Sequence, residues 1–383
     1  MTRPKKSIPF NRPTLKGTEF DNMSAAYSRG DLSGNGAFSK DCEVWLQDNT
    51  GTPRALLTHS CTGALEMAAI LQKLKPGDEV IMPSYTFVST ANAVVLRGAT
   101  PVFCDIRADT LNIDETLIEA LITPQTRAIW VVHYAGVACE MATILDIADR
   151  HDLGVVEDAA QAICASYRGQ ALGTFGDFGT LSFHETKNVT CGEGGALFIN
   201  AAAHIDRAEI IHEKGTNRRA FARGEVDKYT WHDLGSSFLL GELAAAFLRA
   251  QLDAAGETSQ TRLQKWQIYH EALKPLEISG DMVRPVIPQD CVHNAHMYYI
   301  ILAPHHDRRE FLAALKDRGV HAVFHYVPLH LSPASTDYTR APKPLTVTED
   351  LAARIVRLPL YPSLTDEEQA YVIDQVKDLL TGR

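Results

Sequence analysis

Short apolar runs alternate with longer segments of helical periodicity between about residues 55 and 200, and this alternation limits the possible folds more than any other feature. Runs such as Ile129 to Val132 are apolar on both faces, as in strands of a parallel sheet covered by helices. The pattern predicts an α/β domain built from βαβ units. We expect strands at 79–82, 100–105, 127–133, 154–157, 179–183 and 195–199, and helices at 89–97, 114–121 and 140–151.

The pattern changes toward the C-terminus. Two helical stretches, 238–252 and 259–273, lead out of the first region, and the C-terminal part predicts strands at 297–302 and 322–327 and helices at 308–317 and 366–380. A chain of 383 residues is too long for one small core. We therefore predict a large domain with a mostly parallel central sheet at residues 1–255 and a smaller C-terminal α/β domain at residues 256–383.

Charge and apolar patterning exclude several classes of function. The formal net charge of −10 disfavours nonspecific binding to nucleic acid or anionic membrane, which requires a basic face. No segment is long and apolar enough for a membrane helix, and no apolar signal segment follows Arg3, Lys5 and Lys6. The seven cysteines are scattered without a Cys-x-x-Cys pair, and we interpret them as reduced core thiols. We expect a cytoplasmic protein without a metal site.

Polar residues lie where predicted strands end, which is where α/β sheets bind ligands. Asp158 closes an apolar strand, so its carboxylate is costly to bury without a cationic partner. The protonated pyridine nitrogen of pyridoxal phosphate (PLP) would be such a partner. Gln161, one turn later, would face the same space and could donate to the phenolic oxygen of the ring. The alternative is that Asp158 caps a following helix.

Lys187 follows another predicted strand and precedes the glycine-rich turn 192–195. A partly desolvated lysine at this position could form a Schiff base, whereas a lysine taken alone is usually a solvated surface residue. Ser182, near the end of the same strand, could add a hydroxyl group to a phosphate site.

Two strand-to-helix junctions supply further candidates. Thr62 and Gly63 stand at the start of a helical pattern, where free N–H groups and the helix dipole suit a phosphate; the alternative is N-capping by Ser60 or Thr62. Phe87, and less so Tyr85, could stack on a flat heterocycle; the alternative is core packing.

Four motifs occur in an order that resembles the DegT family of nucleotide-sugar aminotransferases: 60–63, 83–92, 156–161 and 182–188. The likeness extends from Ile8 to His330 and covers essentially the whole chain. It implies the aspartate-aminotransferase-like PLP fold (fold type I) and a homodimer in which each active site is completed by the neighbouring subunit. It also implies that PLP binds Lys187.

The resemblance further implies a role for each candidate. Lys187 would carry a proton between the substrate Cα and the cofactor C4′ once an amino donor has displaced it. Asp158 would pair with the pyridinium nitrogen, and Gln161 would contact the phenolic oxygen. Phe87 would stack on the ring. The phosphate would be held by Thr62, Gly63 and Ser182.

Additional stretches, among them 132–141, 213–218 and 322–330, resemble family members of enterobacterial common antigen synthesis. Those enzymes take the amine of L-glutamate and deliver it to C4 of dTDP-4-keto-6-deoxy-D-glucose, which gives dTDP-4-amino-4,6-dideoxy-D-galactose. His325 and Tyr326 are implied to line the sugar-nucleotide pocket. Many relatives carry Asn and Arg where this chain has Ser237 and Leu239, in a segment expected to reach the partner subunit's cofactor phosphate; a serine hydroxyl could keep that contact.

Other functions stay open at this point. An aminotransferase for a C3 ketone or another nucleotide would show the same motifs. A PLP-dependent sugar dehydratase would carry histidine in place of Lys187, and a non-catalytic regulator would be expected to lose Lys187 or Asp158. A nicotinamide-dependent enzyme would need Gly-x-Gly-x-x-Gly after the first strand, which is absent. His133, His325 and His330 lack metal-ligand spacing, and we interpret them as structural or, for His325, as part of the sugar pocket.

Overall fold

A seven-stranded sheet forms the centre of the large domain. In the computed structural model, which describes residues 7–30 and 32–382, its strands lie in the order β1-β9-β8-β5-β4-β2-β3. Strands β3, β2, β4, β5 and β8 are parallel, whereas β9 is antiparallel to both of its neighbours. The predicted mostly parallel sheet is confirmed. The strands span β1 Arg54–Thr58, β2 Glu79–Pro83, β3 Thr100–Cys104, β4 Thr126–Val132, β5 Gly154–Asp158, β8 Phe178–Ser182 and β9 Gly195–Ile199.

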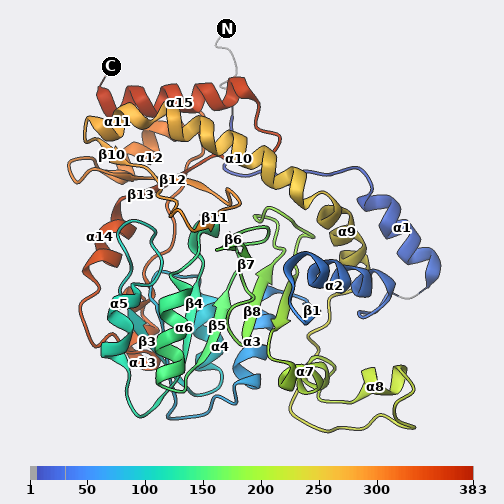
Figure 1. Ribbon diagram of the computed structural model, residues 1–383. Helices are drawn as coiled ribbons and strands as arrows, with labels where there is room; N and C mark the ends of the chain where they lie inside the picture. The colour runs from blue at the N-terminus through green and yellow to red at the C-terminus, as the bar shows by residue number, and fades with distance from the viewer. Residues whose placement is uncertain (1–6, 31, 383) are drawn as a thin grey trace.

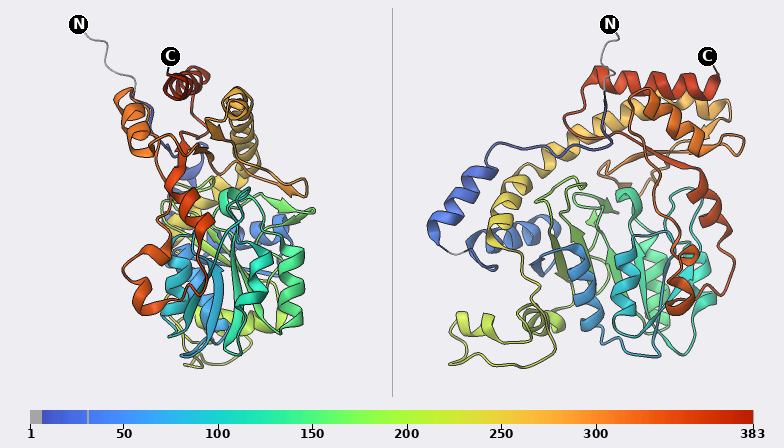
Figure 2. Two further views of the ribbon diagram at one scale, coloured as in Figure 1. Left: turned by 90° about the vertical axis from the view of Figure 1, so that its left-hand side faces the viewer. Right: turned by 180° about the vertical axis from the view of Figure 1, so that it is seen from behind.

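Helices cover both faces of this sheet (Figures 1 and 2). Along β4, Ile129 and Val131 contribute to one hydrophobic core, and Ala128 and Trp130 contribute to the other, because successive side chains of a strand point to opposite faces. The first core includes α2 Ala37–Thr50, α6 Met141–Arg150 and α9 Glu242–Asp253; the second includes α3 Cys61–Leu71, α4 Val88–Val95 and α7 Ile205–His212. Burial on both faces explains the continuous apolar runs in the sequence.

The small domain is a separate layer above the sheet in Figure 1, with a hydrophobic core of its own. Its antiparallel sheet has the order β10-β12-β13, with β10 Met282–Val283, β12 Tyr298–Leu302 and β13 Ile355–Leu358. Its helices are α10 Ala255–Ala272, α11 Lys274–Ile278, α12 Arg308–Asp317 and α15 Asp366–Thr381. The predicted helix at 308–317 is confirmed, and the predicted strand at 297–302 is confirmed to within one residue.

One predicted strand is absent, and one predicted helix begins later than expected. Residues 322–327 form no strand; Val323 alone makes a bridge, to Arg357, because the following side chains line a cavity instead of pairing in a sheet. The helix predicted at 238–252 begins only at Glu242, because Leu239 first bridges Thr58 in an extended conformation.

Two segments cross between the proposed domains 1–255 and 256–383. Ile8 packs into the small-domain core, and Arg340 forms a bridge with Val102 of β3.

The remaining elements are short or lie at the edges. The further helices are α1 Glu19–Arg29, α5 Glu115–Ile118, α8 Arg218–Ala222, α13 Ser335–Tyr338 and α14 Thr346–Arg354; the further strands are β6 Ser166–Tyr167, β7 Gln170–Ala171 and β11 Cys291–Val292.

All seven cysteines are free thiols. Cys164 is exposed in the turn that follows β5, and Cys61 lies on the wall of a cavity, so the interpretation of all seven as core thiols is wrong for these two. None of the helices in the described part of the chain has the length and apolar character needed to cross a membrane.

His212, at the end of α7, should make the protein sensitive to acid. Its Nε2 atom donates to the Leu57 carbonyl at 2.7 Å, and Arg219 donates to its Nδ1 atom at 3.2 Å. Burial, and then the Arg219 charge, lower the pKa of His212 to about 3. Because an unfolded histidine has a pKa of about 6.5, the unfolded state binds one more proton between these values. The contribution of His212 to the unfolding free energy is therefore fully present above pH 6.5 and is lost as the pH decreases toward 3.

We expect His212→Gln to weaken this pH dependence. The slope of the unfolding free energy against pH, measured by chemical denaturation between pH 7 and pH 4.5, should fall by up to about 1.4 kcal/mol per pH unit. Parallel slopes for the variant and the wild-type protein would contradict the assignment to His212.

Candidate active site

A cavity of about 670 Å³ lies between the carboxyl ends of the central strands and the small domain. The structure brings most of the predicted residues to its wall, although they are far apart in the sequence. Gly63 and Ser237 are not among the lining residues; Ser237 is exposed elsewhere on the surface. The predicted residues that do line the cavity are Thr62, Phe87, Asp158, Gln161, Ser182, Lys187, His325 and Tyr326.

Asp158 is a buried carboxylate that faces the cavity. Its Oδ2 atom accepts from the Thr90 hydroxyl at 2.7 Å, and its Oδ1 atom accepts from the Ala160 N–H at 3.1 Å. No helix follows, so the capping alternative is wrong. Burial raises the pKa of Asp158, and no cationic side chain of the described residues forms an ion pair with it. The site therefore favours a cationic ligand atom next to this carboxylate.

Lys187 stands in the turn after β8, with its backbone N–H bonded to the His184 carbonyl at 2.9 Å. Its side chain is partly buried and reaches the cavity, so it is not the solvated surface lysine of the alternative interpretation. Its Nζ atom makes no hydrogen bond or ion pair with any residue that the structure describes. Burial lowers the pKa of Lys187, which increases the fraction of neutral, nucleophilic amine.

The start of α3 offers donors for an anion, though not all of the predicted ones. Ser60 caps the helix, and the Gly63 N–H donates to its Oγ atom at 3.1 Å, so the capping alternative holds for Ser60. The N–H groups of Cys61 and Thr62 have no acceptor among the described residues. The Thr62 hydroxyl lies 2.8 Å from that of Ser89, a cavity residue that the sequence analysis did not single out.

A glycine allows this helix to start so close to the sheet. A Cβ atom at Gly195 of β9 would lie 2.4 Å from the Cys61 nitrogen, closer than atoms can approach. With the Ser182 hydroxyl also on the cavity wall, free N–H groups and hydroxyls gather at one end of the cavity, as a phosphate site requires.

The aromatic wall distinguishes Phe87 from Tyr85. Phe87 is 57% exposed and lines the cavity, whereas Tyr85 is buried in an aromatic cluster with Tyr134.

Two hydrogen bonds fix the orientation of the Gln161 amide. Its Oε1 atom accepts from the Ala135 N–H at 2.7 Å, and its Nε2 atom donates to the Tyr326 hydroxyl at 3.0 Å. One N–H of this amide is left for a ligand.

The three histidines have separate surroundings. His133 bonds to Glu157 at 2.8 Å, and His330 bonds to the Ser84 hydroxyl at 2.7 Å. His325 lies on the cavity wall, where its Nδ1 atom is 2.7 Å from the Tyr134 hydroxyl and its ring stacks on Tyr326. Burial lowers the pKa of His325, so the ring is neutral near pH 7.

Arg357, in β13, is a cavity residue that sequence reasoning missed. Its Nε and Nη2 atoms donate to the Phe324 carbonyl at 3.3 and 3.1 Å, and its guanidinium lies 4.7 Å from the centre of the Phe10 ring. Among the described residues, no carboxylate pairs with it. Burial lowers the pKa of Arg357, as expected for a guanidinium that has no counterion nearby. A strand prediction at 355–358 would have revealed it.

These groups suit one kind of ligand. The Asp158 carboxylate would pair with a cationic ring nitrogen, and the free Lys187 amine would react with an aldehyde. The donors at the start of α3 would bind a phosphate. PLP combines all three features, and Phe87 offers an apolar face to its ring.

Comparison with known proteins agrees with this chemistry. The sequence model of the DegT/DnrJ/EryC1/StrS aminotransferase family matches residues 13–377. The chain is 32% identical to the spore coat polysaccharide biosynthesis protein SpsC of Bacillus subtilis, over 98% of this chain and 97% of that protein. It is 29% identical to GDP-perosamine synthase of Escherichia coli O157:H7, over 99% and 100%. The PLP form of the putative sugar aminotransferase Spr1654 from Streptococcus pneumoniae superposes with a TM-score of 0.90 at 25% identity, over 98% and 99%.

Proposed function

The chain belongs to the DegT/DnrJ/EryC1/StrS family of PLP-dependent sugar aminotransferases, and from this premise we propose a specific reaction for it. It moves the amino group of L-glutamate to C4 of dTDP-4-keto-6-deoxy-D-glucose in the cytoplasm and gives dTDP-4-amino-4,6-dideoxy-D-galactose. The observation that carries the reaction type is that the Lys187 amine and the Asp158 carboxylate face one cavity. The substrate rests on the sequence stretches around His325 and Tyr326, which line the same cavity.

We propose the following cofactor contacts. Asp158 holds the pyridine nitrogen, Gln161 the phenolic oxygen, and Phe87 covers the ring. Ser182 and Thr62 hold the phosphate. Because the Gly63 N–H already donates to Ser60, the amides of Cys61 and Thr62 are the better backbone donors, and Gly63 contributes by allowing the capped turn. When bound, PLP supplies an electron sink for negative charge at the substrate Cα.

Lys187 then moves the proton. Its free amine takes the proton from Cα of the amino donor and returns a proton in the second half-reaction, when the amine passes to the sugar ketone. The burial that lowers the pKa of Lys187 keeps more of the amine in its basic form near neutral pH.

Arg357 is the proposed binding group for the α-carboxylate of L-glutamate, because it is a cation on the cavity wall that has no carboxylate partner among the described residues. We expect Arg357→Met to raise the KM for L-glutamate by about 10- to 100-fold, the effect of losing a charge-assisted hydrogen bond. The KM for the keto sugar should change little. Arg309→Met, on the exposed surface of α12, is the matched control. Steady-state kinetics with each substrate varied in turn tests this, and a selective rise in the keto-sugar KM would contradict it.

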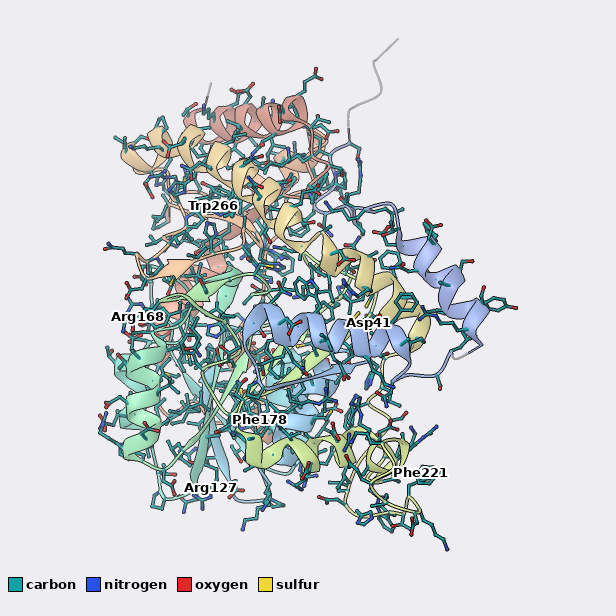
Figure 3. The ribbon with its side chains drawn as sticks, turned by 45° about the vertical axis from the view of Figure 1, so that its right-hand side comes forward. Asp41, Arg127, Arg168, Phe178, Phe221 and Trp266 are labelled. Atoms are coloured by element: carbon teal, nitrogen blue, oxygen red, sulfur yellow. The ribbon has the colours of Figure 1, made fainter. Side chains whose placement is uncertain are left out.

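A homodimer is the proposed assembly. The segment between α7 and α9 extends from the large domain (Figure 1) and carries exposed apolar side chains, including Phe221, labelled in Figure 3, and Trp231, which is 82% exposed. Such side chains are costly to leave in water. Ser237 follows in the same segment and is proposed to reach the partner subunit's cofactor phosphate. Sedimentation equilibrium should give twice the mass of one chain; a monomer at micromolar concentration would contradict this assembly.

Product analysis tests the proposed reaction. Purified enzyme with PLP and L-glutamate is incubated with dTDP-4-keto-6-deoxy-D-glucose and, in parallel, with a GDP-linked 4-keto-6-deoxy sugar. NMR of the product should show an axial amine at C4 of a galacto-configured ring from the dTDP sugar. If the GDP sugar alone reacts, the enzyme keeps its reaction type and the proposed nucleotide is wrong.

A further inference from the structure

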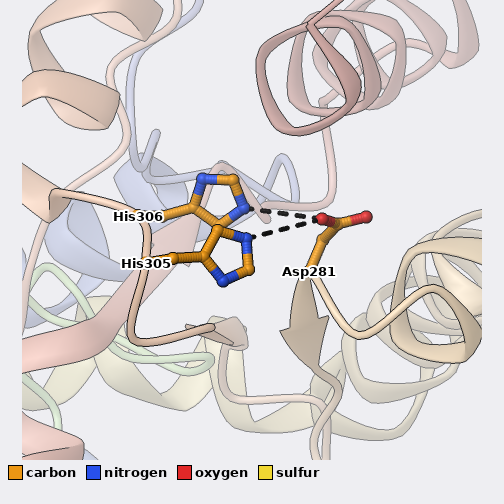
Figure 4. Close-up of side chains that lie close together, drawn as sticks. All are labelled: Asp281, His305 and His306. Carbon is orange, nitrogen blue, oxygen red and sulfur yellow. Dashed lines mark ion pairs between the residues drawn. The ribbon is translucent and has the colours of Figure 1, made fainter.

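Two histidines and an aspartate converge in the small domain (Figure 4). None of the three lines the cavity that holds Lys187. The Oδ1 atom of Asp281 lies 3.8 Å from Nε2 of His305 and 3.6 Å from Nε2 of His306. One ligand atom from each of the three residues lies within 4.8 Å of those of the other two. In the part of the chain that the structure describes, this is the one group of at least three such side chains with metal-binding spacing.

Strand pairing places these residues. Asp281 directly precedes β10, and the two histidines follow β12, to which β10 is paired with Met282 opposite Leu302. The Ala303 N–H donates to the Asp281 carbonyl at 2.9 Å, and the His306 N–H donates to the Ala303 carbonyl at 3.0 Å. The backbone therefore holds both sides of the cluster in place before any ligand binds.

A neighbouring hydroxyl orients the carboxylate. The Ser279 Oγ atom donates to Oδ2 of Asp281 at 2.5 Å, which leaves Oδ1 to face both imidazoles. Hydrogen bonds of this kind fix the orientation of metal ligands in proteins.

The cluster also contains an unsatisfied atom. The Nε2 atom of His306 is buried and has no hydrogen-bond partner in the described part of the chain, which is uncommon and unfavourable in a folded protein. An ordinary ion pair with Asp281 would bring the two atoms closer than 3.6 Å. The observed separations are instead close to the ~3.3 Å between neighbouring ligands of a tetrahedral Zn²⁺ ion with bonds of about 2.0–2.1 Å. The side chain of His305 is 63% exposed and free to close the remaining gap.

We propose that Asp281, His305 and His306 bind one divalent transition-metal ion, with Zn²⁺ as the best match. Two imidazole nitrogens and one carboxylate oxygen suit Zn²⁺, whereas Mg²⁺ and Ca²⁺ prefer oxygen ligands alone. A water molecule from the exposed side of His305 completes the tetrahedron. The ion ties the connection between α11 and β10 to the turn between β12 and α12, and so stabilises this edge of the small domain.

Isothermal titration calorimetry measures Zn²⁺ binding to the proposed site. Chelator-treated holoenzyme is titrated with ZnCl₂, and His305→Gln and Asp281→Asn are compared with it. The matched control is His151→Gln, a histidine beside one carboxylate, Glu119, with no second imidazole. The wild-type protein and the control should bind one Zn²⁺ per chain at this site, and each cluster variant should lose at least about tenfold in affinity. MgCl₂ should produce no binding at this site.

Two outcomes would overturn the proposal: wild-type protein that binds no Zn²⁺, or Zn²⁺ affinity unchanged in both cluster variants. Because His305 is exposed, His305→Gln should fold normally, and circular dichroism checks this. Thermal unfolding gives a second measurement: Zn²⁺ should raise the Tm of the wild-type protein but not that of His305→Gln. The cluster lies outside the cavity, so aminotransferase activity separates a failure of this proposal from a failure of the proposed function.

Discussion

Replacing Lys187 with alanine should abolish transamination and leave the protein folded. Among the described residues, Lys187 supplies the only side-chain amine on the cavity wall, and the proposed reaction uses it both to attach PLP and to move a proton. General acid-base catalysis alone contributes about 10²–10⁴-fold, so a loss of at least about 10⁴-fold in kcat is expected when attachment is lost as well. The Nζ atom has no partner among the described residues, so the fold should not depend on it.

Three measurements separate the roles of this lysine. Lys187→Arg keeps a positive charge but cannot give up its proton, so it should be as inactive as the alanine variant. Lys316→Ala, an exposed lysine on α12, is the matched control and should be fully active. After borohydride reduction, mass spectrometry should find the cofactor on the peptide that contains Lys187. Turnover near the wild-type rate in Lys187→Ala would refute the whole assignment.

Much of this site was predictable from the sequence because the sheet is parallel. The carboxyl ends of β4, β5 and β8 meet at one edge, so Asp158, Gln161 and Ser182 could be placed together from the strand pattern alone. The order of the motifs supplied the family. The long apolar strands were also predicted within one or two residues, because burial on both faces leaves a strong signal.

Tertiary contacts decided what the sequence could not show. Arg357 lies on a four-residue strand whose pairing with β12 is visible only in three dimensions. Residues 322–327 have the composition of a strand, yet His325 and Tyr326 pack against Tyr134 and Gln161 and so leave the sheet. The use of the Gly63 amide by Ser60 depends on side-chain orientation, which no spacing rule gives.

Two adjacent carboxylates on β5 illustrate how the fold separates structure from chemistry. Glu157 points away from the cavity and accepts N–H bonds from Gly173, Phe175 and Gly176 at 2.6–2.8 Å. Asp158 points into the cavity, accepts two hydrogen bonds and has no ion-pair partner among the described residues. The alternation of side chains along a strand therefore gives one carboxylate a structural position and leaves its neighbour available to a ligand.

Replacing Asp158 with asparagine should lower kcat by about 10²–10³-fold, the usual effect of removing one preorganised electrostatic contact. Asparagine has the same shape but cannot stabilise a protonated ring nitrogen, so the cofactor should still attach to Lys187 while its electron demand falls. The cofactor-free variant should be at least as stable as the wild-type protein, because a buried carboxylate with a raised pKa is replaced by a neutral group.

Glu157→Gln is the matched control for this experiment, and it should show the opposite result. Loss of the charge weakens three backbone hydrogen bonds in the core and the contact with His133, so the unfolding free energy should fall by about 2 kcal/mol or more while kcat of the folded enzyme changes little. Single-turnover kinetics and urea denaturation of both variants measure the two effects. Turnover of Asp158→Asn at the wild-type rate would show that the proposed contact between Asp158 and the ring nitrogen is wrong. That contact acts on the reaction only through the negative charge of the carboxylate, which the substitution removes.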